Sequence, residues 1–258
     1  MNFVYIQCAG GVGAQVLSSL VIEYFNKSKI FKDGRYFGSS GAQSIPDGIS
    51  FFEKKIDDQF LKFRWYEKNR YICWAVRRIM YLLSLLSNRV VYIDDFNYLK
   101  LIYASKLETS YLCGQLNECL IASKQTGPSN HLMVAHIRRG DYLKAGLPTL
   151  SLEHLYESLE AENYSSNKLT IVTDSSDLVS FELDRLNRSC DIISGEALKD
   201  LGIMTLSKIF IASDSQFSLV AILLSKSMET VLVPQRWHVL GISELLAKRP
   251  SIKKVVMI

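Results

Sequence analysis

Residues 131–142 read HLMVAHIRRGDY, an apolar run that leads directly into two arginines, a glycine and an aspartate. The apolar part, 131–137, is short and continuous, which is typical of a strand buried on both faces. Strands of that kind belong to parallel sheets that helices cover on each side. We therefore predict a buried strand over 131–137, with the polar segment that follows at its carboxyl end.

The chain after this strand alternates regularly between strand-like and helix-like segments. Ser151 can cap a helix whose Leu152, Leu155 and Leu159 share one face. The other expected strands are 168–173, 191–193, 208–212 and 230–233, and the other expected helices lie near 176–187, 196–207, 217–226 and 242–248, before an apolar tail at 254–258. This alternation predicts a doubly wound parallel sheet. Ligands of such sheets bind beyond the carboxyl ends of the strands.

The preceding half of the chain is less regular. A strand at 3–7 ends in a glycine turn and a helix, and 30–60 reads as loops and short strands. A basic, aromatic helix is expected at 61–89, a strand at 90–93 and a helix near 97–122. The segment 125–130 (QTGPSN) is the clearest linker. We therefore predict two α/β domains, 1–128 and 129–258.

Composition excludes several classes of protein. Apolar residues make up 48% of the 258 residues, so a packed core is expected. The net charge of +4 does not call for nucleic acid, and no apolar run reaches the ~18 residues of a membrane span. Five cysteines without a CxxC pair suggest reduced thiols in a cytoplasmic protein. The chain start reads as a first strand rather than a signal peptide.

The segment 138–141 carries the strongest chemical signal. Arginine offers a planar fork of donors that fits phosphate oxygens, so Arg138 and Arg139 at a strand end suit a nucleotide diphosphate. Gly140 permits a tight backbone, and Asp141 could orient an arginine or accept a hydroxyl. From residue types alone, a structural ion pair at the strand end explains the segment equally well.

The whole segment 136–142 (HIRRGDY) resembles the HxRRxDY motif of the α1,2-fucosyltransferases of glycosyltransferase family 11. The resemblance implies two Rossmann-like domains facing a cleft, the GT-B type, with 1–128 holding the acceptor and 129–258 holding GDP. It implies that Arg138 binds the β-phosphate of GDP-fucose and stabilises the charge of the leaving diphosphate. Arg139 and Tyr142 would support that site. His136 and Asp141 are the motif's candidates for a general base.

The glycine turn after the first strand is similar to the family's GGLGNQ turn. Here 10–15 reads GGVGAQ, which makes Gly11, Gly13 and Gln15 candidates for donor contacts, and Ala14 stands where the family has asparagine. Taken alone, the turn also half-matches two other fingerprints. A P-loop would need a lysine at Ala14, and a dinucleotide turn would need a glycine at Val16.

Three later segments resemble the family in the expected order. Asp174, in VTDSSD (172–177), could hold a guanine edge or a ribose hydroxyl, or it could cap a helix. Ser215, Phe217 and Ser218 match the family's IxANSTFSWW stretch, with one extra residue before Phe217 and with 219–220 (LV) replacing two tryptophans. The segment 233–237 (VPQRW) resembles a late strand end of the family.

Two further features have alternative interpretations. The acid pairs at 57–58 and 94–95 lack the DxD spacing of metal-dependent transferases, so we expect no metal. The basic, aromatic stretch 61–89 could lie on an anionic membrane surface, which would suit a lipid-linked glycan acceptor. It could equally be a helix packed on the core by its aromatic side chains, and we favour that interpretation.

The resemblance as a whole predicts an inverting transferase that moves L-fucose from GDP-fucose to a glycan hydroxyl. An α1,2 linkage and a place in bacterial surface polysaccharide synthesis are expected from the family. Ala14 and the missing tryptophans keep two alternatives open: a transferase of another GDP-sugar, and an inactive nucleotide-binding relative. A nicotinamide oxidoreductase receives no support from the arginine motif.

Overall fold

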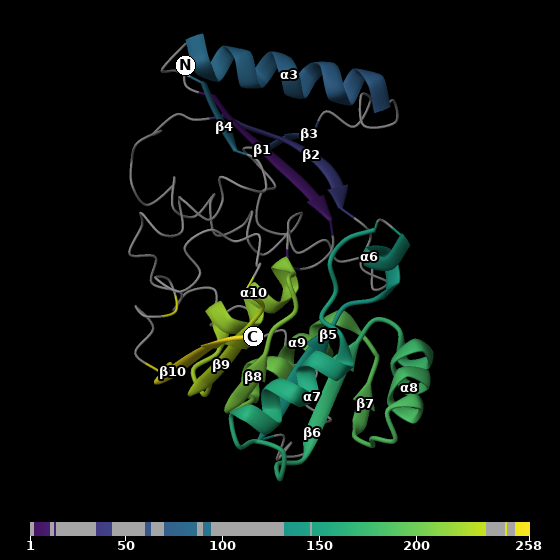
Figure 1. Ribbon diagram of the computed structural model, residues 1–258. Coiled ribbons are helices and arrows are strands. Elements are labelled where there is room, and N and C mark those ends of the chain that lie inside the picture. Colours follow the sequence, from purple (N-terminus) through teal and green to yellow (C-terminus); the bar gives the residue numbers. More distant parts are fainter. Residues whose placement is uncertain are drawn as a thin grey trace. The chain divides into compact units, whose positions relative to one another are not determined.

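The computed structural model describes residues 3–10, 13, 35–42, 60–62, 70–86, 90–93, 132–144, 146–235, 246 and 251–258. The chain divides into two compact units, Met1–Glu108 and Thr109–Ile258. This division and the expected one at 128 both fall within 94–131, outside the described residues, so the domain boundary stays a prediction. Figure 1 labels the helices and strands of both units.

The first unit contains a parallel sheet of four strands in the order β3-β2-β1-β4. Its strands are β1 (Phe3–Gly10), β2 (Arg35–Ala42), β3 (Phe60–Lys62) and β4 (Val90–Ile93). The long helix described in this unit is α3 (Arg70–Leu86), which is blue in Figure 1. The strands expected at 3–7 and 90–93 are confirmed, and β1 runs on to Gly10.

One expectation for this unit is wrong. Of the helix predicted over 61–89, Leu61 and Lys62 pair with β2 as part of a strand, and the described helix covers Arg70–Leu86. The sequence there, Phe60-Leu61-Lys62, is followed by a further aromatic, and aromatic residues favour strands. The helix expected near 97–122 lies outside the described residues.

The second unit contains a parallel sheet of six strands in the order β10-β9-β8-β5-β6-β7. Its strands are β5 (Met133–Ile137), β6 (Leu169–Thr173), β7 (Asp191–Ile193), β8 (Ile209–Ile211), β9 (Thr230–Val233) and β10 (Lys254–Met257). Its helices are α6 (Gly140–Lys144), α7 (Leu152–Ala161), α8 (Ser176–Arg185), α9 (Ala197–Leu206) and α10 (Gln216–Leu224).

This strand order is that of the doubly wound nucleotide-binding fold. The first strand of this unit, β5, lies in the middle of the sheet. The strands β6 and β7 follow on one side of it, and β8, β9 and β10 follow on the other. The fold class predicted from the sequence, α/β with Rossmann-like units, is confirmed. The apolar tail expected at 254–258 forms the edge strand β10. Of the helix expected at 242–248, only Leu246 is described, and it is helical.

Helices cover both faces of this sheet, as the continuous burial of β5 requires. Met133, Ala135 and Ile137 of β5 pack in one apolar cluster with leucines of α7 and α8. The alternate residues Val134 and His136 are equally buried and point to the other face. On that side α10 is buried along 218–224. The predicted α7 cap is confirmed, since the Ser151 hydroxyl accepts from the N–H of His154.

Candidate functional site

The strand order of the second unit reverses between β5 and β8, which are hydrogen-bonded neighbours. Ala135 pairs with Ile211, so 138–140 and 212–215 leave the sheet together at its carboxyl edge. In doubly wound sheets this reversal is where ligands bind, because the connections on its two sides diverge to opposite faces. The motif singled out in the sequence therefore lies at the place that the topology favours for a ligand.

Arg138 lies at this edge with part of its side chain facing solvent. Its Nε lies 3.2 Å from Oδ2 of Asp174, and its guanidinium lies 5.6 Å from the centre of the Tyr142 ring. The side chain is 28% exposed. An arginine held at Nε by a carboxylate and stacked on an aromatic face is restricted in orientation before a ligand arrives.

Asp174 also fixes the backbone of the motif. It follows β6, the neighbour of β5, and its Oδ1 accepts from the N–H groups of Arg139 and Gly140 at 2.9 and 3.3 Å. A Cβ added to Gly140 would lie 2.6 Å from Oδ2 of Asp174, so the close approach needs glycine. Ser175, the N-cap residue of α8, gives that helix no side-chain cap hydrogen bond, and its hydroxyl instead accepts from the N–H of Gly140 at 3.1 Å.

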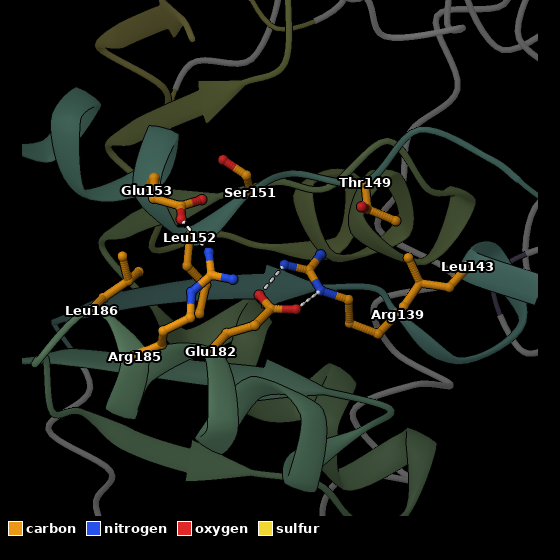
Figure 2. Close-up of a pocket in the computed structure, with 9 residues that line it drawn as sticks. All are labelled: Arg139, Leu143, Thr149, Ser151, Leu152, Glu153, Glu182, Arg185 and Leu186. Atoms are coloured by element: carbon orange, nitrogen blue, oxygen red, sulfur yellow. Dashed lines mark hydrogen bonds and ion pairs between the residues drawn. The ribbon is translucent and has the colours of Figure 1, made fainter.

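Arg139 points away from Arg138, toward α8. Its Nε and Nη2 donate to the two carboxylate oxygens of Glu182 at 3.0 and 2.7 Å, and Nη1 donates to the carbonyl of Leu150 at 2.9 Å. Figure 2 shows this pair inside a cavity of about 260 Å³ whose lining includes Arg139 but not Arg138. The side chain of Arg139 is only 3% exposed. The structure thus separates the two arginines, and Arg139 ties the end of β5 to α8.

His136 lies inside the second unit, on the face that packs against α10. Its Nδ1 is 2.7 Å from the Ser218 hydroxyl and 2.9 Å from the Ser213 hydroxyl, and its ring meets the Phe217 ring edge-on at 5.4 Å. Burial, with a smaller contribution from the Arg138 charge, lowers the pKa of His136 to about 3. The ring is therefore neutral at physiological pH, and its contacts join β5 to the start of α10.

Ser215 and Ser218 serve the start of α10. The Ser215 hydroxyl accepts from the N–H of Ser218 at 3.1 Å, which makes Ser215 the N-cap. The Ser218 hydroxyl accepts from the N–H of Ser213 at 3.2 Å. All three serines are buried. The start of this helix, with its partial positive charge, is thus fixed at the same sheet edge as Arg138.

The sequence interpretation missed Glu182 and Ser213. Glu182 is one of several acids on a helix far along the chain, and nothing local marks it as the partner of Arg139. Ser213 lies just before the segment that holds Ser215 and Ser218. Its contact with His136 follows only from the adjacency of β5 and β8.

Four other predicted site residues are only partly described. Gly11 and Gln15 lie outside the described residues. Gly13 is described as buried and helical. Asp141 is described by its backbone, within α6.

Both arginines of the motif are paired with a carboxylate. Arg138 pairs with Asp174 and keeps part of its side chain in solvent, while Arg139 pairs with Glu182 and is buried. Among the described side chains, no cluster of three His, Cys, Asp or Glu residues has the geometry of a metal site. Within those same parts of the chain, no helix has the length and apolar character needed to cross a bilayer.

Solved structures of glycosyltransferases resemble this chain. Two structures of the fucosyltransferase NodZ, one soaked with GDP-fucose and one from Bradyrhizobium, are 15% and 14% identical in sequence, with TM-scores of 0.46 and 0.44. Each match covers 87% of this chain and 92% of the other.

Two further structures are similar over most of the chain. The E. coli heptosyltransferase WaaC with ADP is 12% identical over 99% of this chain and 93% of the other, with a TM-score of 0.49. POFUT1 in complex with GDP is 12% identical over 90% of this chain and 98% of the other, with a TM-score of 0.37. No protein-family model and no curated protein matches the sequence. The TM-scores of these four structures are all below 0.5.

Proposed function

We propose that this chain is a glycosyltransferase that binds a GDP-sugar at the carboxyl edge of its six-stranded sheet, with Arg138 on the diphosphate. The observation that carries the proposal is the position of Arg138. It lies at the reversal of strand order, it is held by Asp174 and Tyr142, and part of its side chain faces solvent. A phosphate needs a donor group of this kind, and the start of α10 adds a second one.

The reaction requires charge stabilisation more than covalent chemistry from the protein. The acceptor's hydroxyl oxygen forms a bond to the anomeric carbon, and the bond from that carbon to the phosphate oxygen breaks. GDP leaves with the electron pair, and the hydroxyl proton passes to a base. Arg138 stabilises the charge that develops on the departing diphosphate. No metal is needed for this role of the arginine.

The remaining site residues receive roles according to their placement. His136 is neutral, buried and hydrogen-bonded, so we assign it to positioning the start of α10 rather than to proton transfer. Asp141 is then the motif's candidate for the base. Arg139 supports the segment through Glu182. Gly11, Gly13 and Gln15 remain candidates for donor contacts.

The finer identity of the reaction follows the motif resemblance. It supports L-fucose as the sugar, inversion to an α1,2 linkage, a glycan acceptor and a place in surface polysaccharide synthesis in the cytoplasm. A transferase of another GDP-sugar is the second candidate. The observation in its favour is that Leu219 and Val220, which replace the family's tryptophans, are fully buried in α10.

Donor turnover tests the proposal. Release of nucleoside diphosphate is measured from GDP-fucose, GDP-mannose and a UDP-sugar, with a chelator present and with mixed glycans as acceptors. We expect GDP release that Arg138→Ala abolishes and that the UDP-sugar does not reproduce. Release from GDP-mannose alone would select the second candidate. Binding of GDP without any turnover would instead identify an inactive relative, and failure to bind GDP would overturn the proposal.

A further inference from the structure

The second half of α3 presents an unusually apolar surface to solvent. Within α3, six large hydrophobic side chains are exposed: Ile79, Tyr81, Leu82, Leu83, Leu85 and Leu86. The exposed fractions of Leu85 and Leu86 reach 64% and 83%. Single exposed leucines are common on soluble proteins, but a contiguous apolar patch marks a surface that another partner covers.

Four of these side chains form one stripe. Ile79, Leu82, Leu83 and Leu86 follow the spacing i, i+3, i+4 and i+7, which places them on one face of the helix. Met80 is the one other large apolar residue with a described side chain in this half of α3, and it is only half-buried. The exposed side of the helix over 78–86 is therefore at least as apolar as its less exposed side. Apart from Tyr81, the aromatic side chains by which the favoured sequence interpretation packs this stretch on the core lie outside the described side chains, so that interpretation stays a prediction.

The charge of the surrounding sequence indicates which partner fits. Residues 60–89 contain seven basic residues and one acid, Glu67, an excess larger than the net charge of +4 of the whole chain. Within α3 itself there are three arginines and no acid. Arg78 is exposed beside the stripe. Apolar and basic side chains together suit an anionic lipid bilayer, where leucines enter the acyl boundary and arginines meet phosphates.

We propose that the segment 78–86 of α3 docks on an anionic membrane surface, with the helix lying in the plane of the membrane. Its 17 residues fall short of a span, so the helix lies on the bilayer rather than across it. The strength of such binding grows with the apolar area that the helix buries and with its attraction to anionic lipids, and α3 offers the apolar stripe and the exposed Arg78. This surface belongs to the first unit and does not depend on the donor site assigned to Arg138.

Flotation with lipid vesicles tests this proposal on the full chain. The vesicles are phosphatidylcholine alone, and phosphatidylcholine mixed with phosphatidylglycerol. We expect binding to the mixed vesicles that raised salt weakens. The double variant Leu82→Gln, Leu86→Gln should bind at least about tenfold more weakly, because two buried leucines are lost from the interface. The variant Arg78→Gln should bind the mixed vesicles a few-fold more weakly than the wild type, with no change on phosphatidylcholine alone.

A matched control is available on α8, where Leu178 and Phe181 are 46% and 68% exposed. The variant Leu178→Gln, Phe181→Gln should bind vesicles as the wild type does. Absence of binding by the wild type would overturn the proposal, and so would an equal loss in both double variants. A dimer in sedimentation that the α3 variant alone dissociates would mean that a second copy covers this face. GDP binding should be the same in both double variants.

Discussion

At the scale of single residues, Asp174 is as important to the candidate site as Arg138. One carboxylate receives two backbone N–H groups of the motif and also holds Nε of Arg138. The sequence predicted Asp174 either as a ligand contact or as a helix cap. The structure gives both of its oxygens to the protein, so its effect on a ligand passes through the arginine and the backbone that it orients.

Replacing Asp174 separates its acceptor role from its charge. Asp174→Ala removes the acceptor of the N–H groups of Arg139 and Gly140, so we expect the free energy of unfolding to fall by about 1–3 kcal/mol. Asp174→Asn keeps a carbonyl oxygen that can accept these N–H groups, so its free energy of unfolding should fall clearly less than that of Asp174→Ala. Urea unfolding measures both variants. Equal losses would show that the backbone hydrogen bonds contribute little.

Gly140 offers a steric test of the same contact. The Cβ of Gly140→Ala would lie 2.6 Å from Oδ2 of Asp174, so the carboxylate or the segment must move. We expect a loss of about 1–3 kcal/mol in stability, together with weaker GDP binding. Gly195→Ala is the matched control, since its Cβ would lie at an ordinary 3.4 Å from Oδ1 of Asp200. If both variants unfold at the same urea concentration as the wild type, a side chain at position 140 does not clash with Asp174.

At the scale of elements, the two arginines have different roles. Arg138 faces the carboxyl edge of the sheet, and Arg139 ties the end of β5 to α8. His136 makes the corresponding link on the other face, through the serines at the start of α10. The end of one strand is thus fixed to helices on both sides, which holds Arg138 in a defined place.

Loss of the Arg139–Glu182 ion pair should lower the free energy of unfolding measurably. Glu182→Ala would leave the buried Arg139 guanidinium without its carboxylate, and we expect about 2–4 kcal/mol of destabilisation. The pair Arg185–Glu153 also involves α8, which it joins to α7 at the surface, with both side chains well exposed. Glu153→Ala should therefore cost less than about 1 kcal/mol in the same unfolding experiment. Similar losses in the two variants would contradict the assignment of Arg139 as a buried tie.

At the scale of the whole molecule, the buried histidine makes stability depend on pH. The pKa of His136 is about 3 in the folded chain and near its ordinary value when unfolded. The unfolded state therefore takes up the proton first as pH falls. The contribution of His136 to stability is complete above about pH 6.5, and it is lost between there and pH 3.

Comparison of pH profiles tests this prediction. Urea unfolding of the wild type and of His136→Asn is measured at several pH values between about 4 and 7. The stability of the wild type should fall more steeply toward low pH, by up to about 1.4 kcal/mol per pH unit. Parallel profiles would mean that His136 titrates normally in the folded state.

The sequence predicted the second unit well because its signals are local. Buried runs such as 133–137 and a cap such as Ser151 depend on neighbours along the chain. The pairing of Arg139 with Glu182 and of His136 with Ser213 depends on which elements lie side by side, and that follows from strand order. The strand over Phe60–Lys62 was missed because three residues carry too short a pattern, and its pairing depends on β2, which lies far away in the sequence.

The most direct test of the central claim is calorimetric titration of GDP, without added metal, into the wild type, Arg138→Ala and Arg188→Ala. Arg188 is a partly exposed arginine paired with Glu160 on α7, and it serves as the control. We predict that GDP binds the wild type and Arg188→Ala alike, and that Arg138→Ala loses about 2 kcal/mol or more, roughly thirtyfold in affinity. Wild-type affinity in Arg138→Ala, or no GDP binding by the wild type, would contradict the account.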